Sequence, residues 1–169
     1  NGHGTLIAGI VKEVYPEAEL YIIKVIGPSG IALDEESVIL GLEWAVSKNV
    51  KVINMSLRLK DSARLREVIR KAHDKGIIVV AAAGNGQSSV AYPAKYEEVV
   101  AVGALNKYGE VYAASAGGTE VDVLCRGYKG SRAGTSVASA YAAGKAAKII
   151  SENPAAGLTE VRAILQRHS

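Results

Sequence analysis

The amino-acid sequence predicts an α/β fold in which a mainly parallel sheet lies between helices. Strand-like and helix-like segments alternate along the chain with short connections, which is typical of a parallel sheet. Residues 77–83 form a nearly unbroken apolar run, as expected for a strand that is covered on both faces. With 169 residues and 49% hydrophobic residues, the chain has the size and composition of one compact domain. We therefore expect a single domain over residues 1–169.

Five segments are rich in β-branched and apolar residues, which favours strands. The predicted strands cover residues 19–26, 51–56, 77–83, 98–104 and 120–124. Ligands of parallel α/β sheets lie beyond the carboxyl ends of the strands. The loops that start at Gly27, Ser56 and Gly84 are therefore the candidate site loops.

Helical periodicity or composition marks five further segments. One helix follows His3, a second is capped by Asp34, a third by Asp61 or Ser62, and two more span about 135–151 and 159–167. The fourth helix is rich in alanine and the last is amphipathic. No linker, repeat or low-complexity segment interrupts this order.

Composition excludes several classes of protein. No apolar run approaches the roughly 20 residues of a membrane-spanning helix, and the single cysteine, Cys125, excludes an internal disulfide and a multi-cysteine metal site. The net charge of +3 does not demand a nucleic acid, and acidic residues interrupt the basic residues between positions 58 and 75. We expect neither a membrane nor a nucleic-acid partner. The first residues lack the features of a secretion signal, and the compartment, cytoplasmic or extracellular after processing, stays open.

Two glycine-rich loops carry polar side chains of interest. His3 stands between two glycines before an apolar helix, which makes it either an accessible imidazole or a plain surface histidine. Asn85 follows the buried strand in the segment Ala-Gly-Asn-Gly-Gln at 83–87. This segment is either a simple turn or a place where an amide donates to an anionic oxygen. A phosphate-binding loop is excluded because no helix pattern follows it.

A third loop, residues 133–139, places small residues around the hydroxyl of Ser136 at the start of a helix. Thr135 or Ser136 can be a helix cap. Alternatively, Ser136 is a nucleophile whose backbone N–H faces an oxyanion. Together the three loops supply a general base, an oxyanion donor and a nucleophile.

At this point the chain resembles the subtilisin-like serine peptidases, or subtilases. Six motifs carry the resemblance in the family's order and span nearly the whole chain. They are residues 1–5 (NGHGT), 41–45 (GLEWA), 52–57 (VINMSL), 81–85 (AAAGN), 92–94 (YPA) and 134–139 (GTSVAS). The resemblance implies a three-layer, subtilisin-like α/β fold that is truncated at its N-terminus.

The same resemblance implies a serine endopeptidase that hydrolyses peptide bonds through an acyl-enzyme. It makes His3 the general base and acid, Ser136 the nucleophile and Asn85 the oxyanion donor. It further implies a substrate strand between two segments, with peptide or protein as substrate. The substrate-binding residues implied are Ser56, Leu57 and Arg58 on one side, Ser29, Gly30 and Ile31 on the other, and Ala83 and Gly84 beside the first specificity pocket. No cofactor and no metal site are implied for this chain, because the segment 11–20 is short where many relatives carry a calcium loop.

The family's order of catalytic residues is Asp, His, Ser, yet only two residues precede His3. Asp34 and Asp61 are interpreted as helix caps, Asp74 as a helix-surface residue and Asp122 as a structural strand residue. We therefore expect the triad aspartate to come from an upstream segment or a second chain, or the triad to be incomplete.

Arg58, Leu59 and Lys60 stand where the family has a Gly-rich stretch beside the substrate strand. This basic edge either favours acidic substrates or simply narrows the pocket or faces solvent. The main alternative function is a catalytically silent module that binds peptides or scaffolds an assembly. The joint presence of His3, Asn85 and Ser136 favours the enzyme, because a silent module needs none of them. An α/β-hydrolase esterase is disfavoured, because the second glycine of its nucleophile motif is absent.

Overall fold

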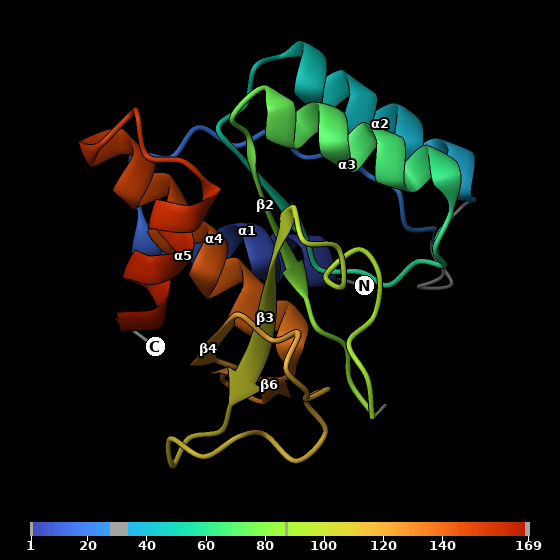
Figure 1. Cartoon of the computed structure of the whole chain (residues 1–169). Coiled ribbons are helices and arrows are strands. Elements are labelled where there is room, and N and C mark those ends of the chain that lie inside the picture. Colours follow the sequence, from blue (N-terminus) through green and yellow to red (C-terminus); the bar gives the residue numbers. More distant parts are fainter. Residues whose placement is uncertain (1, 28–33, 87, 168–169) are drawn as a thin grey trace.

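A four-stranded parallel sheet forms the middle layer of the molecule (Figure 1). It is seen in a computed structural model that describes residues 2–27, 34–86 and 88–167. The strand order is β1-β2-β3-β4, and all three pairings are parallel. The strands are β1 (Val52–Met55), β2 (Ile78–Ala82), β3 (Val99–Leu105) and β4 (Val123–Arg126), and a two-stranded hairpin, β5 (Tyr128–Lys129) and β6 (Arg132–Ala133), follows them.

Helices cover both faces of the sheet. The helices are α1 (His3–Val14), α2 (Glu35–Ser47), α3 (Ala63–Asp74), α4 (Thr135–Glu152) and α5 (Leu158–Arg167). Alternate residues of β2 point to opposite faces: Val80 joins the core formed with α1, α4 and α5, and Val79 joins the core formed with α2 and α3. The α/β fold with a parallel sheet between two helical layers is therefore confirmed.

Most elements form where local patterns predict them. β2 is buried at all five positions, as expected from its apolar run. The side chain of Asp34 accepts a hydrogen bond from Ser37 N at 2.6 Å and caps α2, and this bond holds the pKa of Asp34 below its usual value. The side chain of Ser62 caps α3 through Leu65 N at 3.1 Å, which settles the choice between Asp61 and Ser62.

The prediction of a strand over residues 19–26 is wrong. The described part of the chain has no strand there, and only Ile26 forms an isolated bridge. Apolar β-branched residues favour extended backbone, but a strand also needs a hydrogen-bonded neighbour. Here a cavity separates this segment from β1, the nearest sheet edge. The predicted strand at 120–124 is displaced, since β4 starts at Val123, after a turn at Gly118.

Helices α1 and α4 approach each other closely at Gly144. A Cβ atom at this position would lie 2.7 Å from Val14 Cβ and 3.3 Å from Val11 O. Only a glycine allows the two backbones to lie at this separation. The contact matters for the site because His3 is the first residue of α1 and Ser136 is the second residue of α4.

Candidate active site

Ser136 lies in the first turn of α4, directly after the β5–β6 hairpin. The N-cap of this 18-residue helix is Gly134, at φ +137, and no side chain caps the helix. Neither Thr135 nor Ser136 is therefore the N-cap. The Ser136 side chain is half-buried and its Oγ donates a hydrogen bond to Ser56 O at 3.4 Å. The hydroxyl is thus presented at the positive end of a long helix.

Asn85 is held against this helix end. Its Oδ1 accepts hydrogen bonds from Thr135 N at 3.0 Å and from Thr135 Oγ1 at 3.2 Å. A backbone N–H must meet an oxygen, so Nδ2 forms the other end of the amide. A Cβ on Gly134 would lie 3.2 Å from both side-chain polar atoms of Asn85, so a side chain there would crowd the amide.

The loop after β2 is tied to the same threonine. Gly84 N donates to Thr135 Oγ1 at 3.2 Å, and Thr135 itself is fully buried. Ala83 is fully buried too, and its backbone groups bond to Val102 O and Ala91 N. Of the two residues predicted beside the first specificity pocket, Gly84 lines a small pocket next to Ser136, and the fully buried Ala83 does not line it.

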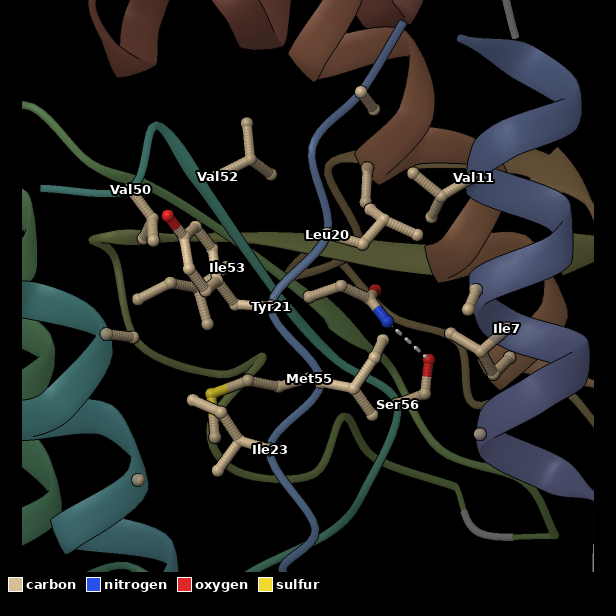
Figure 2. Close-up of a pocket in the computed structure, with 18 of the residues that line it drawn as sticks. Ile7, Val11, Leu20, Tyr21, Ile23, Val50, Val52, Ile53, Met55 and Ser56 are labelled. Carbon is tan, nitrogen blue, oxygen red and sulfur yellow. Dashed lines mark hydrogen bonds between the residues drawn. The ribbon is translucent and has the colours of Figure 1, made fainter. Parts of the chain in front are cut away.

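A partly buried polar network connects the end of β1 to α4. Ser139 Oγ donates to Asn54 Oδ1 at 2.6 Å, and Asn54 Nδ2 donates to Ser56 Oγ at 3.0 Å. Ser56 Oγ in turn donates to Ser136 O at 3.0 Å. The dashed line at Ser56 in Figure 2 marks the second of these bonds. Sequence reasoning missed Asn54 and Ser139, and the only signal for Ser139 is a hydroxyl within an apolar helix.

A small pocket of about 190 Å³, which we call the Ser136 pocket, adjoins the Ser136 side chain. Its lining residues are Leu57, Arg58, Ala82, Gly84, Asn85, Thr135 and Ser136. Five of the predicted site residues are thus brought together from the ends of β1 and β2 and the start of α4. Ser29, Gly30 and Ile31, predicted on the other side of the substrate, lie outside the described residues.

His3 lies at the edge of a second, larger cavity. This cavity has about 1640 Å³ and separates residues 20–26 from β1, and we call it the β1-edge cavity. Figure 2 shows side chains of this segment (Leu20, Tyr21 and Ile23) and of the β1 strand and its flanks (Val52, Ile53, Met55 and Ser56) drawn together around the cavity, with Ile7 and Val11 of α1 at its margin. The lining of this cavity also includes His3, which is exposed, and Ser56, Leu57 and Arg58. Leu57 and Arg58 line both cavities.

Among the residues that the structure describes, no aspartate lines either cavity. Asp61 accepts hydrogen bonds from Tyr96 Oη at 2.6 Å and from the Arg66 guanidinium. These bonds, chiefly the one from Tyr96, hold the pKa of Asp61 below its usual value. Asp122 Oδ2 accepts from Ala101 N at 2.8 Å. Asp122 serves the scaffold, as the sequence predicts. The interpretation of Asp61 as a helix cap is wrong, because Ser62 caps α3 and Asp61 binds Tyr96 and Arg66 instead.

Within residues 2–27, 34–86 and 88–167, no group of three or more His, Cys, Asp or Glu side chains is placed to hold a metal ion. No described helix is long and apolar enough to cross a bilayer. Cys125 is buried, and burial raises the pKa of its thiol.

A parallel α/β domain with a serine hydroxyl at a helix N-terminus and an asparagine amide beside it is an arrangement that serine peptidases use. The family model of the subtilase family (peptidase S8) matches residues 1–169. The chain belongs to the subtilase family of serine peptidases.

The chain is 38% identical over 187 aligned residues to subtilisin DY of Bacillus licheniformis, covering 96% of this chain and 68% of that protein. It is 38% identical to subtilisin E of Bacillus subtilis, covering 96% of this chain and 49% of that protein. The chain thus spans about half of the length of one of these relatives and about two thirds of the other. The crystal structure of a lanthipeptide protease shares the fold with a TM-score of 0.84 at 20% identity, over 99% of this chain and 67% of the other.

Proposed function

We propose that the chain is the nucleophile-bearing part of a serine endopeptidase that cleaves peptide or protein substrates. The observation that carries the proposal is the bond from Thr135 N to Asn85 Oδ1. This bond aims the Asn85 amide group at the pocket that Ser136 also lines. An amide donor and a hydroxyl at a helix N-terminus are the groups that acyl transfer requires.

In this proposal His3 takes the proton of Ser136 Oγ while that oxygen attacks the scissile carbonyl carbon. The carbonyl oxygen becomes an oxyanion, which Asn85 Nδ2 and the Ser136 N–H stabilise. His3 then gives its proton to the leaving amine, and the C–N bond breaks. Water, deprotonated by His3, attacks the resulting ester and releases the acid with Ser136 restored. Ser56, Leu57 and Arg58 form one wall for the substrate strand.

A carboxylate for His3 would come from a segment outside these 169 residues or from a second chain. The β1-edge cavity supports this part of the proposal, since β1 is the edge strand of the sheet and His3 lines the same cavity. An extended segment in this cavity can pair with the free edge of β1. Its end could then place a carboxylate next to the imidazole, which fixes the tautomer and stabilises the imidazolium.

Labelling by a fluorophosphonate probe tests the nucleophile. We expect the purified chain to gain one probe mass, and Ser136→Ala to gain none. Asn85→Ala should label about a hundredfold more slowly, which is the lower end of the effect of the equivalent loss in a subtilisin. A folded chain that fails to label, yet binds peptides equally well with Ser136→Ala, would instead be a silent peptide-binding module.

Addition of a strand peptide tests the source of the carboxylate. A peptide of about six β-branched residues that ends in aspartate should raise the labelling rate at Ser136. The same peptide ending in asparagine is the matched control and should bind without this gain. Equal rates with both peptides would contradict the proposed carboxylate.

A further inference from the structure

The residue after Asn85 is a glycine, and Asn-Gly is the pair in which an asparagine loses its side-chain amide most readily. In this reaction the backbone nitrogen of the glycine attacks the Cγ atom of the asparagine, because no side chain on glycine blocks the approach. Asn85 and Gly86 are both exposed, and a Cβ atom on Gly86 would meet nothing within 4 Å. Water therefore reaches this peptide bond, and no side chain at position 86 hinders ring closure.

Three hydrogen bonds restrain the reacting groups in the folded chain. Thr135 N and Thr135 Oγ1 donate to Asn85 Oδ1 at 3.0 and 3.2 Å and fix the side-chain amide. Gly86 N, the atom that attacks, donates to Ala114 O at 2.7 Å. This nitrogen reacts only after it loses its proton, so its N–H has to leave Ala114 first. Ring closure therefore requires the loop to open locally.

The reaction needs water as its only co-reactant. Gly86 N loses its proton to hydroxide and forms a bond to Asn85 Cγ, while the amide C–N bond breaks. The NH2 group leaves as ammonia with a proton taken from water, and a succinimide ring remains. Water then opens this ring at either carbonyl and gives aspartate or isoaspartate at position 85. The chain thus exchanges NH2 for OH without oxidation or reduction.

From these observations we propose that Asn85–Gly86 is a deamidation site, which Thr135 and Ala114 keep unreactive while the loop is closed. The product places a carboxylate beside Ser136. A carboxylate has nearly the shape of the amide, but it has no N–H donor and carries a negative charge. It repels a developing oxyanion instead of stabilising it. The modification itself does not depend on the peptidase proposal, whereas its consequence, an irreversible loss of reactivity at Ser136, rests on that proposal.

Peptide mapping by mass spectrometry, after incubation of the chain at mildly alkaline pH, measures the reaction at each asparagine. We expect Asn85 to deamidate more than about tenfold faster in guanidinium chloride than in the folded chain, because the loss of one hydrogen bond already gives up to about this factor. Asn49 is the internal control, since it is exposed and the β-branched Val50 after it hinders the attack. It should react slowly in both states. Asn1 also precedes a glycine, and the peptide map separates it from Asn85.

Two variants of Thr135 test the restraint. Thr135→Val removes the bond from the hydroxyl to Asn85 Oδ1 and should speed deamidation of the folded chain about tenfold. Thr135→Ser keeps the hydroxyl and is the matched control, so its rate should stay close to that of the unaltered chain. Circular dichroism checks that both variants fold, and the comparison of the folded and unfolded unaltered chain decides the inference if Thr135→Val does not.

Two outcomes of the peptide map would overturn the inference. One is an equal rate at Asn85 in the folded and the unfolded chain, which would mean that the hydrogen bonds do not restrain the reaction. The other is an Asn85 that reacts no faster than Asn49 in guanidinium chloride. Gly86→Ala should slow the reaction in the unfolded chain, where only the added methyl group differs.

Asn85→Asp reproduces one of the two products and tests the consequence for the site. It should label with a neutral fluorophosphonate at least as slowly as Asn85→Ala, about a hundredfold below the unaltered chain. If Asn85→Asp labels as fast as the unaltered chain, the loss of reactivity is wrong and the peptidase proposal stands. If no probe labels Ser136 in the folded unaltered chain, the peptidase proposal is wrong, and the peptide map alone decides the deamidation site.

Discussion

Replacement of Gly144 by alanine tests how closely α1 and α4 must approach. The new Cβ would lie 2.7 Å from Val14 Cβ, well inside van der Waals contact, and 3.3 Å from Val11 O, so one helix has to move. Overpacking of this kind costs about 1–3 kcal/mol, and the better helix propensity of alanine offsets about 1 kcal/mol. We expect the free energy of unfolding to fall by about 1 kcal/mol.

Gly9→Ala is the matched control, because Gly9 lies within α1 and a Cβ there would meet nothing within 4 Å. The same chemical change should raise the free energy of unfolding by about 1 kcal/mol, purely through helix propensity. Urea unfolding gives both values, and the two variants should differ by about 2 kcal/mol. Because α1 begins with His3, Gly144→Ala should also slow labelling of Ser136. Equal stabilisation by both variants would refute the close approach.

Two further predictions concern buried polar groups. Ser139→Ala removes the 2.6 Å hydrogen bond to Asn54, so we expect the free energy of unfolding, measured with urea, to fall by about 1–2 kcal/mol. Ser151→Ala is the control, because it removes an exposed hydroxyl of the same helix and should change this free energy little. Equal effects of the two substitutions would contradict a stabilising role of the network. Burial, together with the hydrogen bond to Asp61, raises the pKa of Tyr96 from 10.0 to about 12. The folded state therefore keeps the Tyr96 proton where the unfolded chain loses it, and the free energy of unfolding should fall between pH 10 and 12. Tyr96→Phe should flatten this part of the pH profile, and an unchanged slope would exclude Tyr96 as its source.

The sequence predicts best the elements whose signal is local. β2 is an apolar run that any covered strand would show, and Asp34 and Ser62 cap helices through bonds to residues three positions away. The β5–β6 hairpin also had a local signal, the Gly-Ser pair at 130–131 between paired residues. It was missed because its strands are only two residues long.

Features that depend on a partner far away along the chain could not be predicted from the sequence. The segment 19–26 has the composition of a strand, but β1 lies across a cavity from it and cannot pair with it. Asn54 and Ser139 are 85 positions apart and form a hydrogen bond, and the residues adjacent to each of them in the sequence do not indicate this contact. By contrast, local sequence marks His3, Asn85 and Ser136. Glycines flank His3 and Asn85, and Ser136 follows Gly134 at the start of a helix.

Helix α4 carries Ser136 at one end and contacts all four strands of the main sheet as well as α1 and α5 (Figure 1). We therefore expect its first turn to stay formed until the core of the sheet unfolds. Heat should abolish labelling of Ser136 at the same temperature at which the secondary structure melts. The rate at which the probe labels Ser136 would then measure the fraction of the domain that is folded.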